Sequence, residues 1–251
     1  GTTGGIVSGG TLDIHSGDVS NAAGSIQVQS TLDLSSTALN NTNGKINAST
    51  THIDTQGQTL NNTNGQINSD TLSLNSGALN NDAGLIQGTQ GVDINTHGQT
   101  LINANSGTQG GIVSGGSLTV LSGNMGNSGY MGSTGAATLS TAQLNNSGTI
   151  DSANTLYITA TGVDNRGGQI EAVGNASISV GSGSINNDGR LIRSGATTTL
   201  NATSVINSNT NTTGTGIEGA GVSLNANNID NSAGAIRADK LLDINSSGVV
   251  N

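Results

Sequence analysis

An aliphatic residue returns about every 20 residues along the whole chain, and this repeat constrains the fold more than any other feature. The eleven spacings between these anchor residues are 20, 20, 21, 19, 26, 19, 19, 20, 22, 25 and 19. Glycine lies two positions before ten of the twelve anchors, where we expect it to form turns with positive φ. Self-similarity at this period is typical of a solenoid. The anchors are Ile6, Ile26, Ile46, Ile67, Ile86, Ile112, Met131, Ile150, Ile170, Ile192, Ile217 and Ile236.

An alternating aliphatic pair follows most anchors by six to eight residues, as in Leu32/Leu34 and Leu156/Ile158. The second member of the pair is aliphatic in all twelve repeats. The residue between the two is polar throughout, and in the ninth repeat we assign Ser179 to this place. Alternation with one apolar side predicts a half-buried strand.

Two further columns complete the repeat. Aliphatic residues lie seven positions before the next anchor at Val19, Leu39, Leu60, Leu79, Val163, Ile185 and Ile229. Asparagine lies five positions before the anchor in eight of eleven cases: Asn21, Asn41, Asn62, Asn81, Asn145, Asn165, Asn187 and Asn231. We expect these side-chain amides to donate to one another as a ladder along one corner. The alternative is that asparagine is only a favourable turn residue.

A single repeat is too small to fold alone. Each buried aliphatic side chain contributes roughly 1.5–3 kcal/mol, and about five of them do not offset roughly 1–2 kcal/mol for ordering each backbone residue. The whole chain holds only 54 Leu, Ile and Val among 251 residues. Stacking the repeats makes the core continuous. We therefore predict an all-β, right-handed parallel β-helix of about 12 coils of about 20 residues over residues 1–251.

A longer period lies above the 20-residue repeat. The segment GGIVSGGTLDIHSG from Gly4 returns from Gly110 as GGIVSGGSLTVLSG, a shift of 106 residues, and a weaker copy begins at Thr215. We expect two five-coil blocks, about 1–106 and 107–212, and the start of a third at 213–251. The extra residues of the two long repeats, in 104–110 and 208–216, are expected to bulge from one corner. Harmless length drift after duplication is the simpler account of them.

The charge pattern excludes several classes of partner. The formal net charge is −9, and the six basic residues are scattered. Nucleic-acid binding needs a basic patch, so none is expected. No apolar run approaches the ~20 residues of a membrane helix, so no membrane insertion is expected. The chain starts inside a repeat, and we expect it to be part of a longer protein with an open coil edge at each end.

Catalytic and metal-binding residues are not expected either. The best acidic pair, Asp13 and Asp33, shares one column in adjacent repeats and fits an outward solvated row better than a catalytic or calcium site. The three histidines His15, His52 and His97 fall at different places in their repeats, so they do not stack into a metal site. We predict no enzyme activity and no cofactor.

A binding face would show outward aromatic or basic side chains. The sequence offers two candidate groups, Tyr130 with Tyr157 and Arg166 with Arg190 and Arg193. Neither group is large, so binding by this segment itself is the alternative rather than the leading hypothesis.

The pattern L-x-x-x-x-G-x-I, as in Leu39-Asn-Asn-Thr-Asn-Gly-Lys-Ile46, resembles the repeats of filamentous haemagglutinin-type exoproteins. These are the secreted partners of bacterial two-partner secretion systems, and they include adhesins and effectors of contact-dependent growth inhibition. The resemblance implies export through an outer-membrane transporter to the cell surface or the extracellular space. It implies a structural shaft that presents a distal binding or toxin module. The alternative is that this segment itself binds a host or bacterial surface receptor or glycan.

Overall fold

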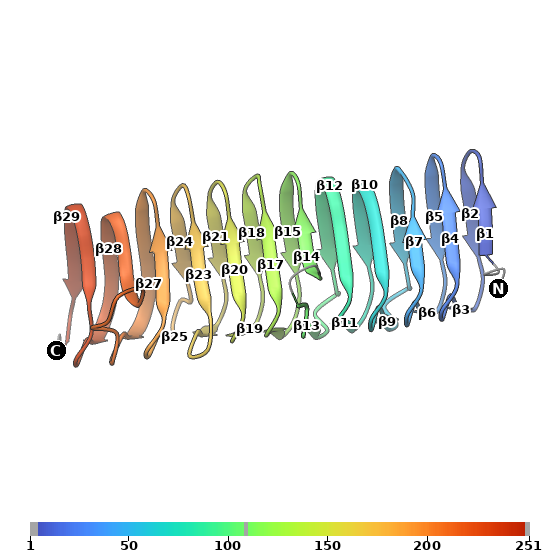
Figure 1. The fold of residues 1–251 in the computed structure, drawn as a ribbon. Helices are drawn as coiled ribbons and strands as arrows, with labels where there is room; N and C mark the ends of the chain where they lie inside the picture. The colour runs from blue at the N-terminus through green and yellow to red at the C-terminus, as the bar shows by residue number, and fades with distance from the viewer. Residues whose placement is uncertain (1–4, 108–109, 249–251) are drawn as a thin grey trace.

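The chain winds into a rod of stacked coils, in a computed structural model that describes residues 5–107 and 110–248 (Figure 1). Each coil runs along three faces of the rod, and every strand pairs in parallel with its counterpart one coil later. The described residues contain strands and turns and no α-helix, so none that could cross a membrane. The predicted parallel β-helix of about 12 coils is confirmed.

The strands divide by face, and the longest of them turn a corner from one face to the next. The first face carries the anchors and consists of β1 (Gly5–Ser8), β4 (Ser25–Val28), β7 (Lys45–Asn47), β10 (Gln66–Asn75), β12 (Leu85–Asn95), β14 (Gly111–Ser114), β17 (Tyr130–Ser133), β20 (Thr149–Ser152), β23 (Gln169–Ala172), β26 (Leu191–Ser194), β28 (Gly216–Asp230) and β29 (Ile236–Ser246). The second face consists of the later parts of β10, β12, β28 and β29 together with β2 (Leu12–His15), β5 (Thr31–Ser35), β8 (Thr50–Asp54), β15 (Ser117–Leu121), β18 (Ala137–Ser140), β21 (Leu156–Thr159), β24 (Ala176–Ser179) and β27 (Thr197–Ile206). The third face consists of the ends of β27 and β28 together with β3 (Asp18–Ser20), β6 (Ala38–Asn40), β9 (Leu60–Asn61), β11 (Leu79–Asp82), β13 (Leu101–Ala104), β16 (Met125–Asn127), β19 (Gln143–Asn146), β22 (Gly162–Asp164) and β25 (Ser184–Asn186).

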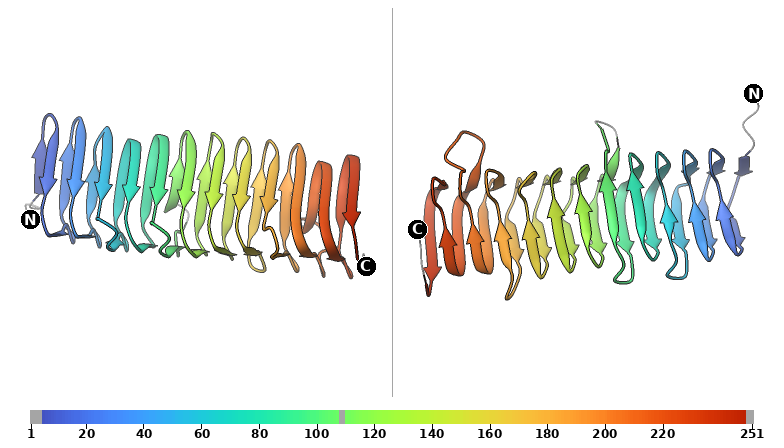
Figure 2. Two further views of the ribbon diagram at one scale, coloured as in Figure 1. Left: turned by 180° about the vertical axis from the view of Figure 1, so that it is seen from behind. Right: turned by 90° about the horizontal axis from the view of Figure 1, so that it is seen from below.

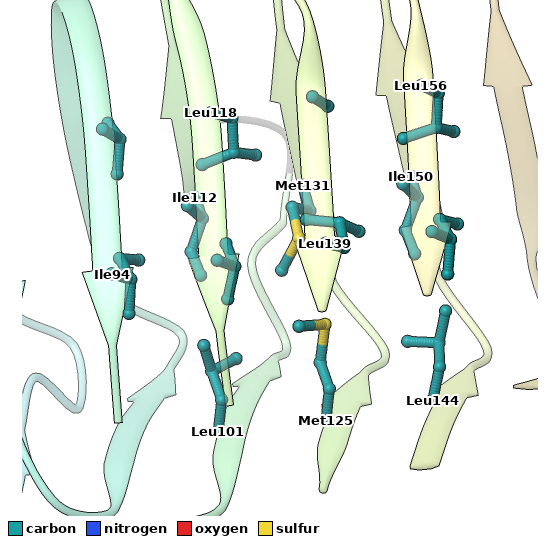
Figure 3. Close-up of a cluster of buried hydrophobic side chains, with 14 of the residues drawn as sticks. Ile94, Leu101, Ile112, Leu118, Met125, Met131, Leu139, Leu144, Ile150 and Leu156 are labelled. Atoms are coloured by element: carbon teal, nitrogen blue, oxygen red, sulfur yellow. The ribbon is translucent and has the colours of Figure 1, made fainter. Parts of the chain in front are cut away.

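The core is built from columns of aliphatic side chains that run the length of the rod. Every anchor pairs in register with the anchor of the next coil, as predicted; Ile112, Met131 and Ile150 form one such row (Figure 3). We number the coils 1 to 12 by these anchors. The side chains of Leu74 on the second face and Ile112 on the first are fully buried. At the last described coil, Leu242 and Ile244 are partly exposed, because no described coil covers them.

The third-face column is longer than the fixed spacing predicts. Leu79 pairs with Leu101, Leu101 with Met125, and Met125 with Leu144, so the column is unbroken. Val205 fills the corresponding place between Ile185 and Ile229. Counting back seven residues from the next anchor missed these four because the turn between the column and the anchor varies in length.

The second face corrects one assignment. Tyr157 pairs with Ser177, so Ser177 and not Ser179 lies between the two inward residues of coil 9. Ala176 takes the first inward place and is fully buried. The sequence pattern missed it because alanine was not counted among the aliphatic anchors.

The predicted asparagine ladder is confirmed and runs without a gap from coil 1 to coil 11. Each side-chain Nδ2 donates to the Oδ1 of the asparagine one coil further on, at 2.7–2.9 Å in all ten bonds. Its members are Asn21, Asn41, Asn62, Asn81, Asn103, Asn127, Asn146, Asn165, Asn187, Asn207 and Asn231. Asn145, predicted as a member, is exposed, and its neighbour Asn146 takes the place.

The second amide hydrogen of the ten donating ladder side chains, Asn21 to Asn207, is also used. It donates at 2.8–3.2 Å to a backbone carbonyl in the next coil, on the residue directly before an anchor. Aspartate or serine could not supply both hydrogens. The corner therefore selects asparagine for its two donors and one acceptor, not for turn propensity alone.

The repeated glycine plays a different part from the one predicted. Gly44 and Gly65 do not adopt positive φ; the preceding residues Asn43 and Asn64 do, at φ 54° and 52°. A Cβ on Gly44 would lie 2.2 Å from the Asn21 carbonyl oxygen and 2.5 Å from Oδ1 of Asn41. Glycine is required there because the ladder side chain fills the space that a Cβ would need.

A column of small hydroxyl residues lines a second corner of the rod. Between the second and third faces lie the buried side chains of Ser36, Thr55, Ser76, Thr96, Ser122 and Thr141. Thr55 and Thr96 donate through Oγ1 to the carbonyl oxygens of Gln58 and Gln99, which closes their turns. Ala160 and Val180 take the same place in coils 8 and 9, so only the asparagine corner is chemically uniform.

The strand register can be tested with a pair of substitutions on one face. Leu74 is fully buried, so Leu74→Asp places an unpaired charge in the core and should lower the free energy of unfolding by at least about 4 kcal/mol. Asp93 is exposed, so Asp93→Asn should change the free energy of unfolding by less than about 0.5 kcal/mol. Denaturant unfolding followed by circular dichroism measures both. Equal effects would mean that the faces are exchanged by a slip of one residue.

The ladder can be tested with two adjacent asparagines. Asn146→Ala removes the acceptor of Asn127 and the donor to Asn165 and to the Gln169 carbonyl oxygen. Each buried polar group left without a partner costs about 1–3 kcal/mol, so we expect a loss of about 3 kcal/mol. The control Asn145→Ala, on an exposed side chain, should stay within about 0.5 kcal/mol. A large effect of the control in the same unfolding assay would contradict the ladder assignment.

Candidate functional site

The asparagine corner shows the largest changes in turn length from coil to coil in the described rod. In coils 1 to 4 the next anchor follows the ladder asparagine by five residues, as in Asn41 to Ile46. In coils 6 and 7 it follows by four, from Asn127 to Met131 and from Asn146 to Ile150. In coil 10 it follows by ten, from Asn207 to Ile217. The corner is therefore low in some coils and raised in others.

The long turn of coil 10, residues 208–216, projects from the same edge of the rod as the segment that follows β13 (Figure 2, right). This agrees with the expectation that both long repeats bulge at one corner, although residues 108 and 109 lie outside the described part. The coil 10 loop is held by its own hydrogen bonds. Thr215 donates through Oγ1 to the carbonyl oxygen of Thr210, and Arg237 donates to that of Thr215.

A polar groove of about 660 Å³ lies along this corner over coils 7 to 9. The shortened turn of coil 7 forms one end of it, and the full-length turns of coils 8 and 9 form the rest. Ligand sites commonly enclose about 300–1,000 Å³, so the groove is large enough for a small ligand. It is lined by Asn145, Asn146, Ser147, Asp164, Arg166, Gly167, Asp188, Gly189 and Arg190.

Two of the predicted basic candidates meet in this groove, and one of them is already paired. Arg166 donates to both carboxylate oxygens of Asp164, with Nη2 2.7 Å from Oδ2 and Nε 3.0 Å from Oδ1. The backbone amide of Arg166 also donates to Oδ1 of Asp164. These donors, the guanidinium first, hold the pKa of Asp164 below its usual range. The Arg166–Asp164 pair is therefore an internal ion pair across the turn of coil 8.

The second carboxylate of the groove is also engaged. Oδ1 of Asp188 accepts 2.8 Å hydrogen bonds from Nδ2 of Asn209 and Oγ of Ser208, both in the coil 10 loop. These bonds lower the pKa of Asp188. Asp188 therefore ties the loop to the groove and is ionised at neutral pH.

Apart from the ladder residue Asn146, the remaining polar side chains of the groove can donate and have no partner in the described part of the chain. Arg190 is exposed, and its guanidinium makes no ion pair there, unlike those of Arg166, Arg193 and Arg237. The side chains of Asn145 and Ser147 are also exposed, and neither makes a hydrogen bond in the described structure. The groove thus presents three side chains with free donors, beside two carboxylates that already accept hydrogen bonds from the chain.

The third basic candidate, Arg193, lies apart on the first face. It forms an ion pair with Glu171 at 2.6 Å, within a charged outward row whose members pair coil by coil. The row consists of Asp151, Glu171, Arg193, Glu218 and Arg237. Since both of its arginines are paired with carboxylates of neighbouring coils, this row offers no free arginine.

The two tyrosines do not form a common binding platform. Tyr130 is half-buried and its ring folds over Gly132, where a Cβ would lie 2.2 Å from the phenol oxygen. Burial, followed by the neighbouring Asp151, raises the pKa of Tyr130. Tyr157 lies on the second face and is half-exposed. No aromatic pair therefore forms a sugar-stacking surface in the described residues.

The acidic pair and the histidines lie where the sequence predicts. Asp13 pairs with Asp33 in the outward row of the second face, and Asp33 with His52. His15 pairs instead with Ser35, one column away, and His97 lies in a turn with Nδ1 3.1 Å from the carbonyl oxygen of Ser76. In residues 5–107 and 110–248, no group of three or more His, Asp or Glu side chains could hold a metal ion.

The sequence named Arg166 and Arg190 but not the groove around them. Asn145, Ser147, Asp164 and Asp188 were not recognised as groove residues because they come from three different repeats and none stands out by type. The available signal was the run of 19-residue spacings after Ile112, which places two shortened turns directly before the arginine-bearing ones.

The comparisons with known proteins agree with the repeat pattern. The family model of the haemagglutinin repeat matches residues 1–51 and 132–191. These segments cover coils near the amino end and the coils that carry the groove. No curated protein and no solved structure matches the chain.

The charged row predicts a pH-dependent contribution to stability. Burial, then the adjacent Glu171, raises the pKa of Asp151. A raised folded-state pKa means that stability falls as pH rises from about 3.9, the unfolded value, through the folded value. Asp151→Asn should therefore raise the melting temperature at pH 7 but not at pH 3. The effect should stay below about 1 kcal/mol, because the site is partly exposed.

Asp164 provides a control of opposite sign. Its pKa is lowered, so its ionised form stabilises the fold above about pH 4, and this is lost as pH falls through the folded value. Asp164→Asn should lower the melting temperature at pH 7 and have little effect at pH 3. Shifts of the same sign for both variants at pH 7 would contradict these assignments.

Proposed function

We propose that this filamentous haemagglutinin-type repeat region is a structural shaft of a bacterial cell-surface or secreted adhesin-type protein, and not an enzyme. The observation that carries the proposal is the unbroken internal order of the rod. The anchor column, the third-face aliphatic column and the asparagine ladder continue through every described coil from the first to the eleventh. Such a stack has no internal joint, so it keeps two ends at a fixed separation.

The composition supports folding outside the cell. The chain has no cysteine and no proline, so neither disulfide pairing nor slow prolyl isomerisation delays folding after export. In the proposed setting an outer-membrane transporter exports the parent protein, and the shaft then carries a distal binding or toxin module. Adhesion and contact-dependent growth inhibition both use such a module, and the repeats themselves do not distinguish the two.

The division into blocks belongs to the same proposal. Residues of about 1–106 and 107–212 form two five-coil blocks and 213–251 begin a third, with the loop of coil 10 near the second boundary. In this view the shaft lengthens by whole blocks, because a new block pairs with the old one through the same columns.

A second candidate function is direct contact of this segment with a surface receptor or glycan. The polar corner groove with Arg166 and Arg190 is the observation that favours it.

The shaft proposal can be tested by removing one block. At about 4.8 Å per coil, 12 coils form a rod of about 58 Å. Deleting residues 107–212 should shorten it by five coils, or about 24 Å, and leave its cross-section unchanged. Small-angle X-ray scattering of both chains measures length and cross-section. A deletion variant that unfolds, or whose length does not fall, would show that the blocks are not modular spacers.

A further inference from the structure

Free hydrogen-bond donors gather around the corner groove. We propose that it binds the carboxylate-bearing ring of an acidic saccharide, such as a uronate or a sialate. The proposal rests on the second candidate function and gives it a site and a ligand class. It does not depend on the shaft role, because rod length and sugar binding are measured in separate experiments.

Both carboxylates of the groove already accept hydrogen bonds from the chain. Asp164 holds the guanidinium of Arg166, and Asp188 accepts from Ser208 and Asn209 of the coil 10 loop. A cationic amine would compete with these donors for the carboxylates, and it would meet the positive charges of Arg166 and Arg190 beside them. The two arginines offset the two carboxylates, so the charge of the groove does not favour a cation.

The free groups are all able to donate. They are the guanidinium of Arg190, the side-chain amide of Asn145 and the hydroxyl of Ser147. Because they come from the turns of coils 7 and 9, they face the groove from both sides of the Arg166–Asp164 pair. A matching ligand is rich in acceptor oxygens and carries one negative charge for Arg190.

The shape of the guanidinium favours a carboxylate. Arginine presents its N–H groups as a planar fork that binds the two oxygens of a carboxylate together. Arg190 is the only arginine in the described residues that has no carboxylate already. The backbone of Arg190 is held in the turn, since its amide donates to the Asn187 carbonyl oxygen and its own carbonyl oxygen accepts from Nδ2 of Asn187.

The lining favours a saccharide over a protein. No apolar side chain lines the groove, which consists of asparagine, serine, glycine and charged residues. Protein and peptide ligands draw most of their affinity from apolar and aromatic anchors in pockets, and the groove has none to receive them. Sugar hydroxyls, in contrast, match the amide of Asn145 and the hydroxyl of Ser147.

The charge of the chain sets a limit on the ligand. The net charge is −9, and Asp164 and Asp188 lie within the groove. A densely sulfated chain would be repelled by these charges, whereas one carboxylate per ring can meet Arg190 alone. Binding through one ion pair and a few hydrogen bonds is expected in the millimolar range.

The test is a titration of the full chain, ¹⁵N-labelled, with oligogalacturonate and separately with sialyllactose. Amide shifts in the NMR spectrum should cluster at Ser147, Arg166 and Asp188. Binding of either sugar supports the proposal and identifies the source of the carboxylate. Oligogalacturonate with methyl-esterified carboxyl groups should bind at least about tenfold more weakly, because the charge-assisted bonds are lost.

Single substitutions distinguish binding at the groove from binding through surface charge elsewhere on the rod. Arg190→Gln should weaken binding at least about tenfold, and Arg190→Lys should weaken it less because it keeps the charge without the fork. Arg193→Gln, on the first face, is the matched control and should leave binding unchanged. Thermal melting checks that each variant is folded.

Several results would overturn the assignment. These are the absence of shifts with both sugars at millimolar concentration, equal binding of the methyl ester, and an unchanged affinity of Arg190→Gln. Tighter binding of a heparin oligosaccharide or of an aspartate-rich peptide would assign the groove to a sulfated or a protein ligand instead.

Discussion

The asparagine ladder sets the register on which the rest of the rod depends. A parallel strand stack with aliphatic columns could slide by two residues, because such a slip keeps every side chain on its own face. The ladder removes this freedom, since each amide makes one bond to the next asparagine and one to a backbone carbonyl. Both bonds are buried, so breaking either leaves a costly unpaired group.

The glycine of the repeat and the residue before it follow from the same corner. The space beside the ladder excludes a Cβ at Gly44, and the positive φ falls on Asn43 instead. The outward neighbour of the ladder closes the turn, as Asn40 does by accepting from the backbone amide of Thr42. The motif L-x-x-x-x-G-x-I is thus one packed unit, in which the leucine and isoleucine fill the core and the positions between them build the corner.

The corner is also where the rod can vary without loss of stability. Turns on the surface can be shortened or lengthened as long as the ladder and the columns stay in place. Shortening in coil 7 lowers the edge at Ser147, while the loop of coil 10 reaches back to Asp188. The otherwise uniform shaft therefore has a local groove at this corner. The charges of the groove belong to turn residues outside the aliphatic columns and the ladder.

The sequence by itself determined the class of fold, the number of coils and the inward columns, because a period of about 20 residues with alternating aliphatics has few other solutions. The pattern placed Asn62 in the ladder correctly but predicted Asn145 in place of Asn146. A fixed count of five residues before the anchor fails where the turn is one residue shorter. Only the tertiary structure decided which polar residues meet across coils. Arg166, Asp188 and Arg190 share a groove because turns of different length are stacked on one edge, and turn length fixes that geometry without leaving a pattern in residue type.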